Sequence, residues 1–135
     1  MEKIFVYGSL MSSFWNHDKV LKNRVKHLVK GQIKGKLYHL PEGYPAVVEG
    51  EESVYGEVCT IAQDKIIKSL DLLEGYLGEG QDNLYERQKR KVILENGQEE
   101  ECWAYIYVNK EYAKTKGIGI VHGDWKKFMG KNKNK

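Results

Sequence analysis

The sequence predicts an α+β domain, a small barrel-like sheet with two helices packed on it. Short runs of alternating apolar residues outnumber the helical patterns along the chain. Gly31 and Gly35 interrupt the apolar pattern of residues 25–39, and glycines inside a strand are typical of bulges and of the bends at barrel corners. Asn96-Gly97 joins two strand-like runs and is a favoured pair for a tight type I′ hairpin turn.

The first half of the chain is expected to hold one helix among strands. In order, the pattern predicts a strand at 3–8, a helix at 12–23, one or two strands at 25–39, a turn-rich segment at 41–50 and a strand at 53–61. Ser12 or Ser13 is the expected N-cap of the helix, since serine accepts hydrogen bonds from the first free amides of a helix. The turn-rich segment holds both prolines of the chain, Pro41 and Pro45.

The second half predicts a helix, a hairpin and a weakly patterned end. In order, we expect a helix at 63–75 that ends at Gly75, a loop at 76–83, two hairpin strands within 85–108 and an irregular segment that ends with Trp125 and Phe128. Three glycines punctuate that last segment, at 117, 119 and 123. No internal repeat or linker is visible, so residues 1–130 are expected to form one domain and residues 131–135 a disordered basic tail.

Composition is that of an ordinary soluble globular protein, with 41% hydrophobic and 30% charged residues. The sequence has no apolar run of the roughly 18 residues that a membrane span needs and no signal-peptide pattern near its start. Cys59 and Cys102 lack the spacing of a metal site, and both lie in apolar strand-like runs. We therefore expect buried thiols in a reducing cytoplasm.

The formal net charge of +3 comes from the tail, because residues 131–135 contain three lysines and the rest of the chain is balanced. The segment 87–91 (RQKRK) is the only internal basic cluster. On a strand its charges would alternate between the two faces. A nucleic-acid partner is therefore not expected, since such a partner requires a basic face on the folded part of the chain.

One carboxylate of the predicted helix 63–75 lies on the face that should be buried. On a helical wheel the aliphatic residues form a stripe centred on Leu70, and Glu74 falls about 40° from that centre, whereas Asp71 lies about 100° away, at the border. A buried carboxylate is costly unless paired, and burial raises its pKa toward the range of a general base. From the pattern alone, Glu74 reaches solvent at the last helical turn, pairs with a cation such as Arg87, or moves a proton.

The stretch Tyr7-Gly8-Ser9-Leu10 comes directly after the first predicted strand. Gly8 lets the backbone turn with few steric limits, and successive free N–H groups in such a turn can bind an anion. A carboxylate or the oxygen of a polarised carbonyl would fit such a loop. The alternative is an ordinary strand-to-helix turn.

Six short motifs occur in order along the chain. They are Tyr7-Gly8-Ser9-Leu10, Gly43-Tyr44-Pro45-Ala46, Gly56-Glu57-Val58, Leu70-Asp71-Leu72-Leu73-Glu74-Gly75-Tyr76, Tyr85-Glu86-Arg87 and Gly123-Asp124-Trp125. Together they resemble the gamma-glutamylcyclotransferase-like family, particularly its small bacterial members and the gamma-glutamylamine cyclotransferases. The resemblance covers about residues 3–128, nearly the whole chain.

The resemblance implies a small mixed β-barrel with flanking helices and a cavity lined by the first loop. It also implies a reaction, in which a gamma-glutamyl amide cyclises to 5-oxoproline and releases its amine without a metal or organic cofactor. Glu74 would be the general acid and base, and the amides of Gly8, Ser9 and Leu10 would bind the alpha-carboxylate or the carbonyl oxygen of the glutamyl group. Further candidates for substrate contact are Tyr7, Tyr44, Tyr85, Arg87 and Tyr105.

Several alternatives stay open from the sequence. Arg87 serves equally well as a structural partner of Asp71 or Glu74. Residues 77–83 contain no proline, whereas similar members of the family often have one soon after the Glu-Gly pair. This loop borders the expected site, so the difference bears on which leaving amine the site accepts. A non-catalytic small-ligand binding protein of the same fold is the second functional hypothesis. The expected partner is a small gamma-glutamyl substrate, with no nucleic acid and no membrane, and the expected state is a monomer or weak homodimer.

Overall fold

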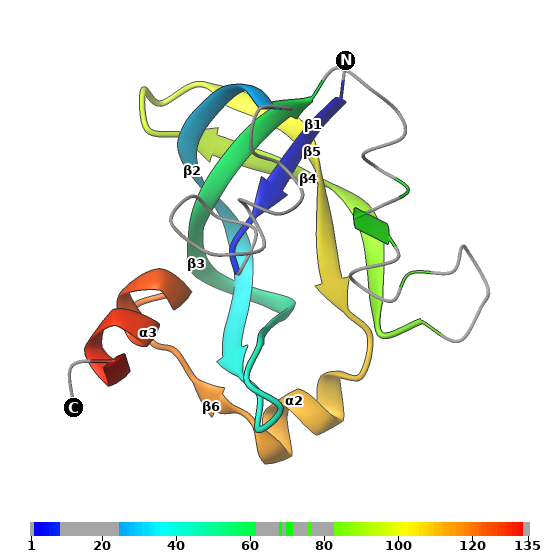
Figure 1. The fold of residues 1–135 in the computed structure, drawn as a ribbon, viewed down its shortest axis with the longest axis vertical. Helices are drawn as coiled ribbons and strands as arrows, with labels where there is room; N and C mark the ends of the chain where they lie inside the picture. Colours follow the sequence, from blue (N-terminus) through cyan, green and yellow to red (C-terminus); the bar gives the residue numbers. More distant parts are fainter. Residues whose placement is uncertain are drawn as a thin grey trace.

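The computed structural model describes residues 2–8, 25–61, 68, 70–71, 76 and 83–133, and for residues 2, 25–27 and 131–133 it describes the backbone alone (Figure 1). Its elements are β1 (Glu2–Val6), β2 (Val25–His39), β3 (Pro45–Ile61), β4 (Tyr85–Leu94), β5 (Glu99–Tyr107), α2 (Lys110–Lys116), β6 (Ile118–Gly119) and α3 (Trp125–Lys133). The predicted helix 12–23 lies outside the described residues. Of the predicted helix 63–75, Lys68, Leu70 and Asp71 are described, and all three are helical.

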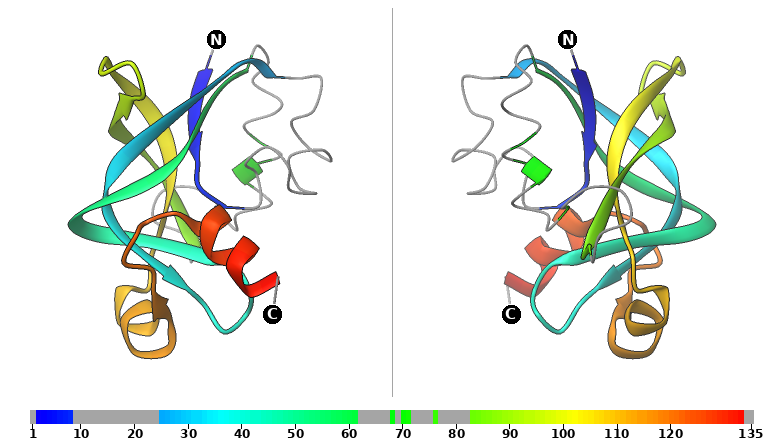
Figure 2. Two further views of the ribbon diagram at one scale, coloured as in Figure 1. Left: turned by 90° about the vertical axis from the view of Figure 1, so that its left-hand side faces the viewer. Right: turned by 90° about the vertical axis from the view of Figure 1, so that its right-hand side faces the viewer.

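Five of these strands close into a barrel. The strand order is β3-β1-β5-β4-β2, and the ring closes because β2 also pairs with β3. The pairing of β1 with β5 is parallel and the other pairings are antiparallel, so the barrel is mixed. The predicted fold class is therefore confirmed. The short β6 pairs with the end of β2, and Figure 2 shows α2 and α3 at the end of the barrel away from the N-terminus.

Glycines allow the barrel strands to approach one another closely. A Cβ atom at Gly56 would lie 2.3 Å from the carbonyl oxygen of Val6 and 2.7 Å from the ring of Phe5, which is fully buried. A Cβ atom at Gly35 would lie 2.9 Å from Val47, and the register of β2 against β3 shifts just after Gly35. The expectation of glycine-bent strands is confirmed, because side chains at these positions would push the sheet apart.

Three elements differ from the sequence prediction. β3 starts at Pro45, so the part of the turn-rich segment 41–50 after Tyr44 is strand, paired with the end of β2. Proline is tolerated at the first residue of a strand, and long-range pairing with β2 makes the next residues extended. The helix α2 was not predicted, although Asn109 caps it by accepting a hydrogen bond from the amide of Tyr112 at 3.0 Å. α3 reaches Lys133, within the segment expected to be a disordered tail.

Both cysteines are fully buried free thiols, as predicted. Burial raises the pKa of Cys59 to about 12 and that of Cys102 to about 11, and nearby glutamates act in the same direction. The hairpin prediction is also confirmed, since β4 and β5 pair from Tyr85 opposite Tyr107 to Ile93 opposite Glu99, with Gly97 at a φ of 89° in the turn.

The close approach at Gly56 makes a direct prediction about stability. Gly56→Ala should lower the free energy of unfolding by about 1–3 kcal/mol, because the added methyl group would meet the backbone of β1. The matched control is Gly130→Ala in α3, where an added Cβ has no neighbour within 4 Å and alanine favours the helix by roughly 0.5–1 kcal/mol. Urea unfolding of both variants measures the difference. Equal stability of the two variants would contradict this account of the barrel.

Candidate functional site

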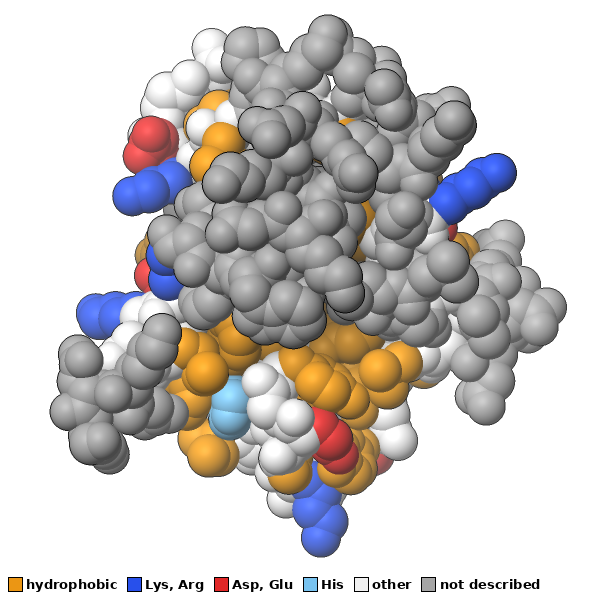
Figure 3. All heavy atoms as spheres, viewed as in Figure 1, with side chains coloured by type: hydrophobic (Ala, Val, Ile, Leu, Met, Phe, Trp, Pro, Cys, Tyr) orange, Lys and Arg blue, Asp and Glu red, His pale blue; other side chains and the backbone are white. Residues whose placement is uncertain are grey.

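The end of β1 and the start of β3 meet at Gly8 and Pro45. A Cβ atom at Gly8 would lie 2.7 Å from Cγ of Pro45 and 3.2 Å from its Cδ. The proline ring therefore occupies the space that a side chain at position 8 would need. Gly8 and Pro45 belong to two of the motifs found in the sequence, so the described parts of these two motifs come together in space. Figure 3, viewed as in Figure 1, shows hydrophobic side chains gathered on the lower part of the molecule, with acidic and histidine side chains among them.

Tyr85 also holds Pro45 in place. It is the first residue of β4, it is buried, and its hydroxyl donates a hydrogen bond to the carbonyl oxygen of Pro45. Its ring lies 6.3 Å from the ring of Tyr44 and meets the ring of Tyr107 edge-on at 5.2 Å. A third motif, residues 85–87, therefore joins the first two at the same place.

Tyr7 and Tyr105 connect this place to Asp71. The hydroxyl of Tyr7 donates to the backbone carbonyl of Tyr105, and the hydroxyl of Tyr105 donates to Oδ1 of Asp71 at 2.6 Å. Nε of Arg87 donates to the same carboxylate oxygen at 2.9 Å. Arg87 and Tyr105 are directly opposite in the pairing of β4 with β5, which brings both donors to one acceptor. Asp71 thereby links the helical residues of the fourth motif to the barrel.

Arg87 is engaged on several sides. Besides its ion pair with Asp71, its guanidinium lies over the ring of Trp103 at 4.4 Å and near that of Tyr76 at 5.7 Å. Its side chain is 21% exposed and that of Asp71 is 16% exposed. The pairing with Asp71 is one of the structural alternatives that the sequence left open for Arg87.

Leu70, at the centre of the predicted apolar stripe, is fully buried. Asp71, expected at the border of that stripe, is partly buried in the structure. Glu74, Ser9 and Leu10 lie outside the described residues, so their roles stay predictions. Sequence reasoning did not assign Asp71 its role as shared acceptor, although its position beside Leu70 in the Leu-Asp-Leu-Leu-Glu-Gly motif was a usable signal.

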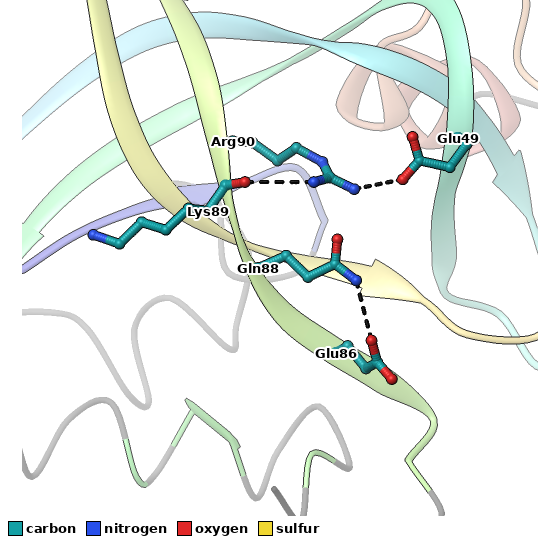
Figure 4. Close-up of polar contacts among 5 residues, drawn as sticks. All are labelled: Glu49, Glu86, Gln88, Lys89 and Arg90. Carbon is teal, nitrogen blue, oxygen red and sulfur yellow. Dashed lines mark hydrogen bonds and ion pairs between the residues drawn. The ribbon is translucent and has the colours of Figure 1, made fainter. Parts of the chain in front are cut away.

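Acids and aromatic rings engage the cations of the basic cluster 87–91. On β4, Arg90 lies 2.5 Å from Oε1 of Glu49, and Gln88 donates to Glu86 at 3.1 Å (Figure 4). Nζ of Lys89 lies over the ring of Trp103 at 4.4 Å, as the guanidinium of Arg87 does. Arg87, Lys89 and Lys91 are two residues apart and share one face of β4, so the predicted alternation of charges separates Arg90 alone from the others.

Tyrosine hydroxyls near Pro45 are held in their neutral form. Burial is the main cause that raises the pKa of Tyr107, and Tyr44 and Glu42 add to it. The hydroxyl of Tyr112 donates a hydrogen bond to the carboxylate of Glu42, which is the main reason why the pKa of Tyr112 rises to about 12. These groups can donate and accept hydrogen bonds at neutral pH, but they do not supply a base.

Two other motifs meet at a separate cleft of about 640 Å³, between the middle of β2, the second half of β3, the end of β4 and the start of α3. Glu57 is buried in its wall, 4.0 Å from Nζ of Lys126, and the amide of Tyr55 donates to the carbonyl of Gly123 at 2.8 Å. Gly123 has a φ of 74°, and a Cβ there would collide with the carbonyl oxygen of Ser53, so this packing requires glycine.

Among the described residues, no group of three or more histidine, cysteine, aspartate or glutamate side chains is placed to hold a metal ion. None of the helices within the same residues has the length and apolar character that crossing a membrane requires.

A small mixed β-barrel with flanking helices is the fold that the resemblance of the six motifs implied, and the structure has it. The family model described as "Gamma-glutamyl cyclotransferase, AIG2-like" matches residues 4–127. The chain therefore belongs to the AIG2-like gamma-glutamyl cyclotransferase family.

Two relatives agree with this family. The chain is 39% identical over 132 residues to a protein of Methanocaldococcus jannaschii named "Putative gamma-glutamylcyclotransferase MJ1514", covering 96% of this chain and 100% of that protein. It is 32% identical over 129 residues to the "Gamma-L-glutamyl-butirosin B gamma-glutamyl cyclotransferase" of Niallia circulans, covering 95% of this chain and 78% of that protein.

Solved structures share the fold. YkqA of Bacillus subtilis superposes with a TM-score of 0.72 at 27% identity, over 99% of this chain but only 43% of that longer chain. An AIG2-like protein of Mus musculus superposes with a TM-score of 0.68 at 21% identity, over 92% of this chain and 87% of that one. The barrel architecture therefore recurs in proteins whose sequences have diverged widely.

The shared acceptor Asp71 yields a prediction about stability. Asp71→Ala should lower the free energy of unfolding by about 1–3 kcal/mol, because two donors lose their partner in a mostly buried setting. In a double-mutant cycle with Tyr105→Phe, the two changes should be non-additive by about 0.5–3 kcal/mol.

Glu51→Ala is the control for this cycle, since Glu51 pairs with Lys34 on an exposed surface and such pairs contribute roughly 0–1 kcal/mol. Urea unfolding measures all the variants. Additive effects of Asp71→Ala and Tyr105→Phe would mean that the hydrogen bond between these residues does not stabilise the fold.

Proposed function

We propose that this protein is a gamma-glutamyl cyclotransferase, which converts a gamma-glutamyl amine or amino acid into 5-oxoproline and the free amine. The observation that carries the proposal is the family match over residues 4–127. The names of the two relatives support the same activity. The meeting of the motifs around Tyr7, Gly8, Pro45 and Tyr85 adds support, because it builds a fixed wall next to the loop proposed to bind the glutamyl group.

In this reaction the substrate supplies its own nucleophile. The alpha-amine attacks the gamma-carbonyl of the same molecule, a new C–N bond closes the five-membered ring, and the C–N bond to the leaving amine breaks. The alpha-ammonium nitrogen loses two protons as it becomes the N–H of the lactam, and the nitrogen of the leaving amine gains two and departs as an ammonium ion, so no oxidant, reductant or co-reactant is needed. The protein has to hold the substrate folded, move these protons and stabilise the oxyanion of the tetrahedral intermediate.

Each part of this task has a proposed residue. Glu74 takes the proton from the alpha-ammonium group and returns it to the leaving amine. The amides of Gly8, Ser9 and Leu10 bind the glutamyl group. Asp71 lies three residues before Glu74, so the hydrogen bonds from Tyr105 and Arg87 to its carboxylate would fix the segment that carries the proposed base.

The tyrosines proposed to contact the substrate differ in their exposure to solvent and in their hydrogen bonds. Tyr44 is partly exposed beside Pro45, which suits contact with a substrate. Tyr7, Tyr85 and Tyr105 are buried, and their hydroxyls donate to Tyr105, Pro45 and Asp71 respectively, which suits positioning of the site. The partner proposed is a small molecule, and the engagement of the basic cluster 87–91 by acids and rings weighs against nucleic acid.

The test is release of 5-oxoproline from a panel of gamma-glutamyl amines and gamma-glutamyl amino acids. We expect turnover by the wild-type protein, and Glu74→Gln should lower it by about 10²–10⁴-fold because the amide keeps the shape of the side chain but cannot carry the proton. Glu99→Gln is the matched control, since Glu99 is exposed at the far end of the β4–β5 hairpin and should leave turnover unchanged.

Three results would count against the proposal in different ways. Ligand binding by calorimetry without any 5-oxoproline would favour a binding protein of the same fold. Turnover that survives in Glu74→Gln would remove Glu74 from its role. Neither binding nor product across the panel would reject a gamma-glutamyl substrate.

A further inference from the structure

The cleft beside α3 has a floor made of three neighbouring strands. Gln32 of β2 lies opposite Tyr55 of β3 and Ile93 of β4, so these three side chains form one row across the sheet. Lys30 lies two residues before Gln32 and therefore shares its face of the strand. Tyr55 is 45% exposed and Ile93 is 37% exposed. The floor of the cleft therefore presents apolar side chains and a polar amide to solvent.

The start of α3 forms one wall of the cleft and is fastened to β3. The backbone hydrogen bond from Tyr55 to Gly123 joins the two segments, and Nζ of Lys126 lies 4.0 Å from the carboxylate of the buried Glu57. Asp124, which lies between Gly123 and Lys126 in the chain, also lines the cleft. Because strand and helix hold each other at two points, the cleft is formed before a ligand binds, as is usual for small-molecule sites.

A cation and an anion that do not pair with each other line the cleft where β2 meets the end of β4. The amide of Glu95 donates a hydrogen bond to the carbonyl of Lys30 at 3.0 Å, so the two residues are neighbours across the strands. Neither lies in an ion pair within the part of the chain that the structure describes, whereas Lys34 of the same strand pairs with Glu51 at 3.6 Å. Two exposed groups of opposite charge are therefore available to a ligand.

Charges of both signs line the cleft as a whole. They belong to Lys30, Glu57, Glu95, Asp124 and Lys126. A ligand with a single charge would also meet like charges, whereas a ligand that carries both charges can place each beside its opposite. The volume of about 640 Å³ lies within the range of about 300–1,000 Å³ that is typical of small-molecule sites. The exposed rings and methyl groups of Tyr55 and Ile93 favour a ligand with apolar side chains.

We propose that this cleft is a second binding site of the protein, and that it takes a small zwitterion with apolar side chains, namely a short α-linked peptide with free ends. The ammonium group of Lys30 binds the terminal carboxylate of the peptide, and the carboxylate of Glu95 binds its terminal ammonium group. The apolar side chains of the peptide cover Tyr55 and Ile93.

The cleft is separate from the site at Gly8 and Pro45, although one strand pair connects the two. Neither of these residues lines the cleft. Glu57, in the wall of the cleft, lies opposite Val6, which is two residues before Gly8. The inference does not rest on the proposed function, because a peptide can bind in the cleft whether or not the protein releases 5-oxoproline.

The test is a titration of the wild-type protein with L-leucyl-L-leucine. It is followed by nuclear magnetic resonance through the backbone amides of Gly31 and Gly97 in the cleft and of Gly8 and Tyr44 at the other site. We expect saturable shifts of Gly31 and Gly97 below about 10 mM peptide. N-acetyl-leucyl-leucine lacks the ammonium group and leucyl-leucinamide lacks the carboxylate, so each should bind about 2–5-fold more weakly, the effect of one exposed ion pair.

Two variants assign the charges to the ends of the peptide. Lys30→Gln should remove the preference for the free carboxylate and keep the preference for the free ammonium group, and Glu95→Gln should do the reverse. The matched controls are Lys34→Gln and Glu51→Gln, which make the same changes of charge at an exposed pair outside the cleft and should keep both preferences.

Three results would overturn the inference while the proposed function stands. The first is the absence of saturable shifts at Gly31 and Gly97, and the second is saturable shifts confined to Gly8 and Tyr44. The third is equal affinity for the free peptide and for both blocked peptides, because the ends of the peptide would then not be recognised. Release of 5-oxoproline is measured separately, so its failure would leave the inference intact.

Discussion

The contact between Gly8 and Pro45 is the constraint on which the rest of the candidate site depends. It joins the end of β1 to the start of β3, two strands that meet elsewhere through the pairing of Val6 with Glu57. The proline ring leaves room for glycine alone at position 8. The hydrogen bond from Tyr85 to the carbonyl of Pro45 then ties β4 to the same point. Three strands of a closed barrel thus fix one short stretch of backbone.

A second tie lies at Asp71, where the barrel holds the helical residues of the fourth motif. Tyr105 and Arg87 donate to one carboxylate oxygen, and Tyr7 donates to the backbone of Tyr105. The tyrosine just after β1 is therefore connected through β5 to the segment that contains the proposed base. This arrangement accounts for a site assembled from short motifs spread along the chain, since four of the six motifs supply members of a common network.

The barrel could be predicted from the sequence because the strand glycines and the Asn-Gly turn set the conformation of the backbone at their own positions, and a sequence pattern reveals such local conformation. It missed the start of β3 at Pro45, because pairing with the end of β2 overrides the turn character of the prolines. It missed α2, a helix of seven residues that depends on the cap at Asn109 and on the burial of Ala113. The hydrogen bond from Tyr112 to Glu42 could not be predicted from the sequence pattern, because seventy residues separate the two in the chain.

Gly8→Ala tests most directly the claim that the Gly8–Pro45 contact positions a cyclotransferase site. The measurement is kcat/KM for 5-oxoproline release, made beside the free energy of unfolding of the same variant. A displacement of about 1 Å at a reacting centre costs roughly 10²-fold, so we predict a loss of that order in a protein that remains folded at the assay temperature. A folded Gly8→Ala variant with wild-type kcat/KM would contradict the account.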